Sequence, residues 1–385
     1  MVSRELAAAD PLRLILGRLQ AARVAAGVDR ADVERQLILG PGWLEKLESG
    51  SVPVPTDLLL ALAHLSRTDL ASLVEGIGVD HPATLRRALF ATTTSTGIEL
   101  HFAYGDYDAS YALDGASIEE FEVVLSTLRD ALASSSGKAD AVTSAYLTAV
   151  RLWPSANPSD IWWFLLYRAY LDPFNHPASD ARRNFHQSWV RTAGWALERV
   201  LVRHYADALR AHGVRIFIAS AQEKLALLPR VDLARRLEAD KVDVMLTGTI
   251  NGLETFLGAV HVKASFAERR TDDVPLSEAL IGAGYMSIFW TMDCKSAPSV
   301  SPVNRGELGA VLIGDTDKRS AKRRDFEVEG SFSACFSYNQ RTERTPDDQT
   351  AAARVYRCTF ANPNDEFVRF VVDGWRELYA AKSGV

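Results

Sequence analysis

An acidic residue and a lysine stand at the ends of two neighbouring apolar runs in the middle of the chain. Asp243 lies in the run 242–246, and Lys263 closes the run 256–263. Both runs are short, rich in β-branched residues and bounded by Gly or Asn, so they predict two adjacent strands. A charge inside an apolar strand costs free energy unless it is paired or binds a metal. The two residues therefore predict a functional site.

A carboxylate and a lysine on neighbouring strands suit the hydrolysis of phosphodiesters. Carboxylate oxygens are ligands that Mg²⁺ prefers, and bound Mg²⁺ polarises a phosphate and acidifies a coordinated water. The lysine can stabilise charge on the phosphate. A third apolar run, 285–292, is followed by Asp293 and Lys295, which adds further charges at the end of a strand.

The order of these residues resembles the PD-(D/E)-x-K nuclease superfamily. Asp243 matches its first acid, and His261-Val262-Lys263 matches the (D/E)-x-K tripeptide, with His261 in place of the second acid. Restriction endonucleases of this superfamily that read C-C-G-G cores often carry that acid on the helix after the lysine. The resemblance implies that Glu278, in the expected helix 275–280, completes the metal site in place of His261.

The resemblance implies further site residues. A helix before the catalytic strands often carries an acid that holds a metal or its water, and Glu198 matches that position; a surface Glu paired with a neighbouring Arg is the alternative. After the lysine, the C-C-G-G group has an R-(D/E)-R run that reads bases, and here Ala267 replaces its first Arg. The residues that follow are Glu268, Arg269 and Arg270. Arg can bridge guanine O6 and N7, and Glu can accept from cytosine N4, which places a C-C-G-G-like core in the DNA site.

A second basic segment follows the expected strands. It runs from Asp317 to Arg324, and its cationic candidates for DNA binding are Lys318, Arg319, Lys322 and Arg323, with Arg305 ahead of them. Such a segment is either a solvated loop or, beside a nuclease core, a loop that contacts phosphates. Arg305 and this segment are also candidates to supply the base contact that Ala267 cannot make.

The N-terminal residues predict a separate helical module. Apolar positions recur at helical spacing in 12–19, and Ser49-Gly50 closes a short helix as a C-cap. The run L-x-x-x-E-S-G-x-x-x-P-x-x-x-x-L-x-x-L-A resembles the helix-turn-helix of phage-repressor and Cro-type regulators, whose third helix enters the major groove. Here that helix, 42–48, offers only Lys46 as a cationic reader of bases. DNA binding and a role in packing or dimerisation both remain open for this module.

The rest of the chain predicts an α/β (α+β) fold: a nuclease core with a mixed sheet flanked by helices, preceded by the helix-turn-helix module and a helical region. The expected domains are 1–80 (helix-turn-helix), 81–138 (helical connector) and 139–385 (catalytic). The expected helices are 85–91, 117–133, 139–152, 160–168, 179–211, 223–228, 231–238 and 365–381. The further expected strands are 214–219, 307–313, 330–338 and 354–360.

Composition excludes several classes of protein. The chain has 385 residues and a net charge of −6, which argues against a purely electrostatic DNA binder. It has no apolar run of membrane-spanning length and no signal peptide. Its three cysteines are widely spaced, which fits a reducing cytoplasm and gives no Cys-based zinc site. Motifs of P-loop NTPases, HExxH metalloproteases and GxSxG hydrolases are missing.

These observations predict a type II restriction endonuclease that uses Mg²⁺ to cleave double-stranded DNA at a short specific site. Cutting both strands at a fixed place favours a homodimer on a palindromic or near-palindromic site. Two alternatives remain open. One is a helix-turn-helix regulator whose C-terminal part senses a ligand without chemistry, and the other is a repair or defence nuclease without strict sequence choice.

Overall fold

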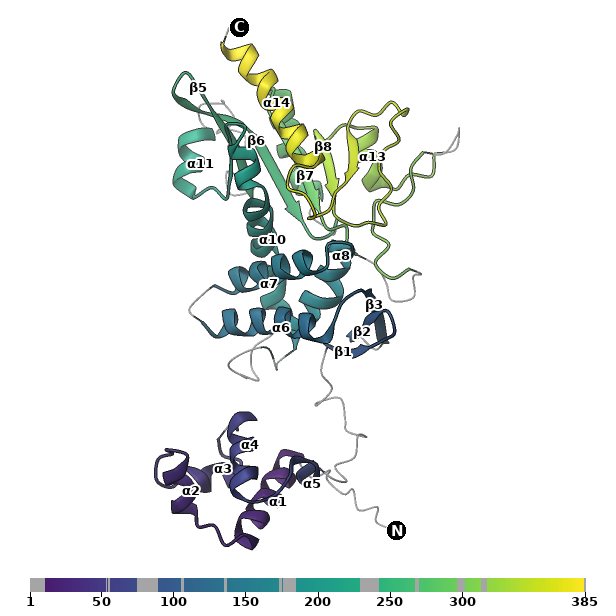
Figure 1. Ribbon diagram of the computed structural model, residues 1–385. Helices are drawn as coiled ribbons and strands as arrows, with labels where there is room; N and C mark the ends of the chain where they lie inside the picture. Colours follow the sequence, from purple (N-terminus) through teal and green to yellow (C-terminus); the bar gives the residue numbers. More distant parts are fainter. Residues whose placement is uncertain are drawn as a thin grey trace, which may run out of the picture. The chain divides into compact units, whose positions relative to one another are not determined.

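The computed structural model describes residues 11–52, 54, 56–74, 89–104, 107–134, 137–172, 175, 185–228, 242–266, 270–295, 302–312 and 317–383. The chain divides into two compact units, residues 1–86 and 87–385, whose elements are labelled in Figure 1. The expected helix at 231–238 lies outside the described residues.

The first unit is all-helical, as the sequence predicts. Its helices are α1 (Pro11–Ala25), α2 (Arg30–Gln36), α3 (Trp43–Glu48), α4 (Thr56–Leu65) and α5 (Leu70–Val74). Leucines at helical spacing make its core, among them Leu16 and Leu47, which are fully buried. The Glu48 carboxylate fixes α3 against the other helices, because it pairs with Arg23 at 2.7 Å and Arg30 at 2.8 Å.

The second unit begins with a sheet where the sequence predicts a helical connector. Its strands are β1 (Leu89–Thr93), β2 (Gly97–Tyr104) and β3 (Tyr107–Asp114), paired antiparallel in that order. The expected helix at 85–91 is therefore wrong from Leu89 onward. Ile98, Leu100 and Phe102 alternate as buried positions on β2, and this period of two is the pattern of a half-buried strand.

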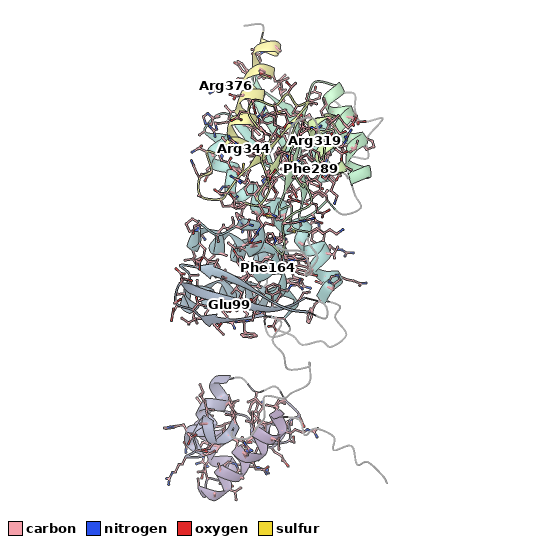
Figure 2. All side chains as sticks on the ribbon, turned by 90° about the vertical axis from the view of Figure 1, so that its right-hand side faces the viewer. Glu99, Phe164, Phe289, Arg319, Arg344 and Arg376 are labelled. Atoms are coloured by element: carbon pink, nitrogen blue, oxygen red, sulfur yellow. The ribbon has the colours of Figure 1, made fainter. Side chains whose placement is uncertain are left out.

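Helices connect this small sheet to the rest of the second unit. They are α6 (Ile118–Ala133), α7 (Lys138–Leu152), α8 (Pro158–Asp160), the π-helical turn η2 (Ile161–Leu166), α9 (Tyr167–Leu171) and α10 (Phe185–Arg210). The apolar stretch 160–168 is buried, as predicted, and its Phe164 packs against Phe102 of β2 with ring centroids 4.7 Å apart. Figure 2 marks Phe164 beside the sheet that carries Glu99.

The remainder of the second unit contains a mixed sheet, as predicted, and this sheet has six strands. Its elements are β4 (Val214–Phe217), α11 (Ala221–Leu227), β5 (Val244–Ile250), β6 (Leu253–Lys263), α12 (Arg270–Gly282), β7 (Met286–Thr291), α13 (Ala321–Glu327), β8 (Ala334–Ser337), β9 (Arg354–Arg357) and α14 (Glu366–Ser383). The strand order is β4-β5-β6-β7-β8-β9. The first three strands pair antiparallel, and β6 to β9 pair parallel.

The register of the sheet brings several chain segments to one edge. Lys263 pairs with Thr291, and Thr291 with Ser337, so β6, β7 and β8 end together. Because β5 runs antiparallel to β6 and Val244 pairs with Val260, the residue before β5 lies at that edge too. This residue is Asp243. Open α/β sheets bind ligands at the carboxyl ends of their parallel strands, so we expect the site at this edge.

One expected strand is missing from this sheet. The residues of 307–313 that the structure describes, 307–312, form a loop. The backbone of this loop is bonded by a side chain instead of by a neighbouring strand. Arg323 donates hydrogen bonds to the carbonyl oxygens of Leu308 and Gly309, each at 3.3 Å. The loop therefore depends on α13 for its position.

Candidate active site

Lys263 lies between two carboxylates at the sheet edge. Its Nζ is 3.0 Å from Asp243 Oδ2 and 3.5 Å from Asp273 Oδ2. Asp243 also accepts the backbone N–H of Val262 at 3.4 Å, which ties the start of β5 to the end of β6. The three charged side chains are between 8% and 21% exposed. Such partly buried charges interact more strongly than charges on the surface.

Charge and burial compete in this cluster. Burial alone would lower the pKa of Lys263, but the charges of Asp243 and Asp273 outweigh it and raise that pKa. Burial would likewise raise the pKa of Asp273, but the neighbouring His261 and the charge of Lys263 hold it below its ordinary value. Lys263 and Asp273 are therefore both charged at neutral pH.

Helix α10 brings Glu198 to the same group. Burial, together with the nearby charge of Asp243, raises the pKa of Glu198 to about 7, although Lys263 opposes the shift. Glu198 and Asp243 line one cleft of about 440 Å³. The expectation that a helix before the strands supplies an acid to this site agrees with this geometry.

The acid that reaches Lys263 from α12 is Asp273, and this corrects the expectation for Glu278. Asp273 lies on the buried face of α12 with Leu276 and Leu280, whereas Glu278 is exposed. The two acids are five residues apart, which is about 140° around an α-helix. The Glu278 carboxylate instead accepts a hydrogen bond from Ser331 Oγ at 3.4 Å.

His261 positions Asp273 from the neighbouring strand. The imidazole is 1% exposed, its Nδ1 lies 3.7 Å from Asp273 Oδ1, and its Nε2 is 3.0 Å from Ser287 Oγ. A buried histidine at this position needs a partner. That need, together with leucines three and seven residues after Asp273, is the sequence signal that could have identified Asp273.

The donor atoms of this cluster fit a hard cation. Asp273 Oδ2 is buried and has no hydrogen-bond donor among the described residues. Mg²⁺ needs only one or two protein carboxylates because it keeps several of its waters. Within the described part of the chain, no three His, Cys, Asp or Glu side chains form a ready-made metal cage. This agrees with Lys263 occupying the space between Asp243 and Asp273.

The basic segment before and within α13 is divided between internal and exposed cations. Arg323 is fully buried, with its Nη1 2.7 Å from Glu327 Oε1, so the expectation that it contacts DNA is corrected. Arg319 pairs with Asp317 at 2.9 Å and with Glu327 at 3.2 Å. Lys322 forms an ion pair with Glu307. Lys318 is exposed.

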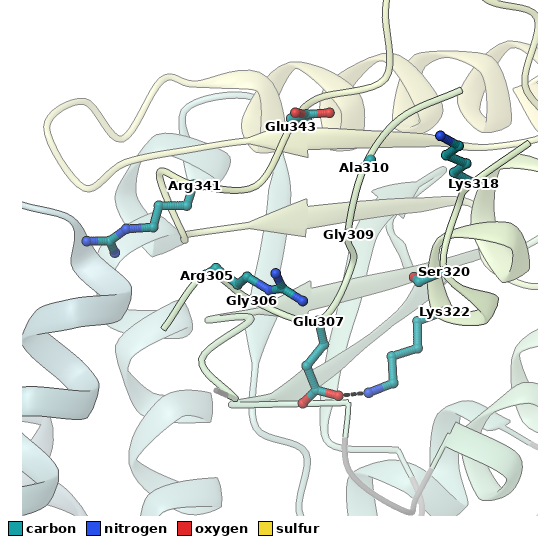
Figure 3. A pocket seen from close by; sticks show the side chains of 10 residues that line it. All are labelled: Arg305, Gly306, Glu307, Gly309, Ala310, Lys318, Ser320, Lys322, Arg341 and Glu343. Carbon is teal, nitrogen blue, oxygen red and sulfur yellow. Dashed lines mark ion pairs between the residues drawn. The ribbon is translucent and has the colours of Figure 1, made fainter. Parts of the chain in front are cut away.

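A cleft of about 600 Å³ opens beside this segment (Figure 3). Arg305 and Lys318 line it and are exposed. Arg341 also lines it, and its guanidinium is held by Asp160 at 2.6 Å. Figure 3 shows Arg305 on the loop beside Glu307, with Lys318 across the cleft. This cleft offers two exposed cations to a phosphate or a base.

Three other candidates lie in or beside a part of the chain that the structure does not describe. Glu268 and Arg269 lie outside the described residues, and of Arg270 only the backbone, at the start of α12, is described. Lys46 is exposed on α3. The proposed base readers therefore remain predictions.

A lysine between carboxylates, at the edge of a mixed sheet flanked by helices, is the arrangement that we expect of an endonuclease from the sequence. Residues 15–89 match the family described as "Helix-turn-helix domain". The chain is 38% identical over 241 residues to the type II restriction enzyme AgeI of Thalassovita gelatinovora, which covers 60% of this chain and 83% of that protein. It is also similar to the crystal structure of a specific restriction endonuclease AgeI–DNA complex, with 34% identity, a TM-score of 0.64, and coverage of 72% of this chain and 99% of the other.

The chain therefore belongs to the type II restriction enzymes and is a site-specific endonuclease. The sequence-based predictions of this family and of a helix-turn-helix module are confirmed. None of the described helices is both long and apolar enough to span a membrane.

Proposed function

We propose that Asp243, Asp273, Lys263 and Glu198 form the active site of a Mg²⁺-dependent restriction endonuclease. The observation that carries this proposal is the position of Lys263, 3.0 Å from Asp243 and 3.5 Å from Asp273. Bound Mg²⁺ supplies charge to the phosphate and acidifies a coordinated water. Asp243 and Asp273 would hold the ion.

Each remaining side chain has an assigned task in this proposal. Lys263 stays protonated beside its acids, and its ammonium stabilises the charge that develops on the phosphate. Glu198 lines the same cleft as Asp243 and holds the ion or the attacking water. His261 orients Asp273 from behind.

Recognition of DNA is assigned to two segments of the chain. Glu268, Arg269 and Arg270 follow the strand that ends at Lys263, so base reading and catalysis lie close together in sequence, and Arg in this role favours a G·C-rich, C-C-G-G-like core. Arg305 and Lys318 would contact the same DNA from the cleft beside α13. Lys46 of α3 is the candidate contact of the helix-turn-helix module.

The assembly and location complete the proposal. A homodimer on a palindromic site would place one active site on each strand. Residues 1–80 would be the helix-turn-helix domain, 81–138 the connector with its small sheet, and 139–385 the catalytic domain. The three cysteines are buried and free, which supports the reducing cytoplasm.

The test is incubation of purified protein with plasmid and phage DNA, with Mg²⁺ or with EDTA. Discrete fragments that require Mg²⁺, and that disappear in an Asp243→Asn variant, are the expected result. A smear with Mg²⁺ would overturn sequence-specific cleavage by this site. Discrete fragments from the Asp243→Asn protein would overturn the assignment of the site.

A further inference from the structure

The cleft that contains Glu198 and Asp243 is also lined by side chains of different chemistry. They include Trp195 of α10, Ile218 after β4, and Lys224 of α11. Trp195 is 51% exposed and Ile218 is 38% exposed. Apolar side chains beside a small number of charged groups are the usual lining of a ligand site. An indole has a broad apolar face and a polar edge, which suits a sugar ring.

The two cations that line the cleft differ in whether they are already paired. Arg199 is paired, because its Nε lies 3.2 Å from Asp140 Oδ1. Lys263, outside this lining, is engaged by Asp243 and Asp273. The ammonium of Lys224 has no ion pair or hydrogen bond with any residue that the structure describes. Its charge nevertheless acts on Glu198, whose pKa it lowers against the larger effect of burial.

A polyanion that enters a cleft lined by the carboxylates of Glu198 and Asp243 needs a cation in the same cleft. Lys224 is placed to provide it, and Trp195 lies one helical turn before Glu198 on the same face of α10. The volume of about 440 Å³ is in the range of small-ligand sites. The cleft is therefore large enough for one nucleotide unit of a DNA strand.

We propose that this cleft holds the nucleotide next to the cleaved phosphodiester, with Trp195 and Ile218 against its deoxyribose and Lys224 on its phosphate. This inference rests on the proposed active site, since it uses Asp243 and Glu198 to mark the place of cleavage. It assigns Lys224 and Trp195 as substrate-binding residues of the cut strand, separate from the base-reading segments.

The experiment uses the full-length protein and a duplex that carries its mapped cleavage site, with binding measured in Ca²⁺ instead of Mg²⁺. Single phosphates on either side of the cut are replaced, one at a time, by neutral methylphosphonates. The wild type should lose about tenfold in affinity at one of these positions. Lys224→Met should lose about tenfold with the normal duplex, and should show no further loss with that one methylphosphonate.

Salt dependence gives a second measurement of the same contact. Loss of one phosphate contact should reduce the slope of log K against log salt by about 0.9. Lys138→Met is the matched control, because Lys138 is exposed on α7 and its Nζ contacts Ser188 Oγ at 3.1 Å. This control should keep the full slope and the full methylphosphonate effect. If Lys224→Met does so too, the contact to phosphate is refuted.

The contact of Trp195 is tested with variants that differ in the size and aromatic character of the side chain. Trp195→Ala should weaken binding of the cognate duplex about tenfold, as loss of an aromatic contact does, whereas Trp195→Phe should keep most of it. Leu225→Ala is the control, because Leu225 is 69% exposed on α11 but does not line the cleft. Cognate DNA should also protect the wild type from acrylamide quenching, and Trp195→Phe should lose this protection. Unchanged protection in Trp195→Phe would overturn the assignment.

Failure of this inference differs from failure of the active site. Normal cleavage by Asp243→Asn would refute the active site. Loss of cleavage in Asp243→Asn, together with an unchanged methylphosphonate pattern in Lys224→Met, would refute the nucleotide cleft alone. Thermal unfolding of each variant checks that the protein is folded.

Discussion

Two charged regions at the same end of the catalytic region use their ions in opposite ways. In the acidic cluster of Asp243, Asp273 and Glu198, one lysine is surrounded by carboxylates, and the pKa of Glu198 is raised to about 7 by burial and by Asp243. Beside the basic segment 317–324, the carboxylate of Glu327 is held by two of the segment's cations, Arg319 and Arg323. Burial would raise the pKa of Glu327, yet hydrogen bonds from Thr345 and Arg323 hold it below its ordinary value.

The difference distinguishes the residues that we propose for catalysis from those that stabilise the fold. Both carboxylate oxygens of Glu327 are satisfied, since Arg323 and Arg319 pair with them and Thr345 donates to Oε1 at 2.8 Å. In the acidic cluster, Asp273 Oδ2 has no hydrogen bond among the described residues, and Lys263 Nζ lies 3.5 Å from it. A satisfied buried network stabilises a fold, whereas unsatisfied carboxylate oxygens are ready for an ion. We therefore expect substitutions in the two regions to fail in different ways.

The largest effect should come from the acidic cluster. Asp243→Asn and Lys263→Met should each lower the cleavage rate by about 10²–10³-fold or more, because each removes a charge that acts on the phosphate or holds its ion. Single-turnover cleavage of a cognate duplex measures this. The unfolding free energy should change little by comparison. Near-normal cleavage by either variant would show that the acidic cluster is not the active site.

The next effect distinguishes two acids on α12. Asp273→Asn should lower cleavage about a hundredfold, because Asp273 lies beside Lys263. Glu278→Gln should cleave at close to the wild-type rate, because Glu278 is exposed on another face of the helix. The same single-turnover assay decides between them. A severe loss in Glu278→Gln with a mild one in Asp273→Asn would restore the expectation from sequence.

The basic segment should respond in stability rather than in chemistry. Arg323→Met should lower the free energy of unfolding by about 3 kcal/mol, because removing one partner of a buried ion pair leaves the other uncompensated. Lys318→Met, its exposed neighbour in sequence, should change that free energy by less than about 0.5 kcal/mol and should weaken DNA binding. Urea unfolding and a DNA titration measure the two quantities. Equal stability of both variants would show that the buried Arg323 does not stabilise the fold more than the exposed Lys318 does.

The smallest effect is a dependence on pH in the same segment. The folded-state pKa of Glu327 lies below its ordinary value of 4.5. Its ion pairs therefore stabilise the protein above pH 4.5, and this contribution is lost as the pH falls through the folded-state pKa. Glu327→Gln should show a shallower loss of stability below pH 4.5, measured by urea unfolding across pH. An equally steep loss would assign the acid sensitivity to other groups.

The sequence determined the chemistry of the acidic cluster and its order along the chain. Asp243 and Lys263 stand in apolar runs where an unpaired charge is costly, so their types alone indicated a site. The two runs also predicted adjacent strands. The helical spacing in residues 12–19, with the helix-turn-helix pattern that follows, predicted the first unit. These are local patterns, and local patterns can be read without knowing the fold.

The tertiary structure decided which acid of α12 joins the cluster and which cations are exposed. Asp273 and Glu278 are close in sequence, but only the face that packs with Leu276 and Leu280 turns Asp273 toward Lys263. Lys318 and Arg323 belong to one run of charged residues. Arg323, however, donates hydrogen bonds to backbone carbonyl oxygens of the loop 307–312, where the sequence predicts a strand. Both outcomes depend on long-range packing, which the spacing of charges along a chain does not contain.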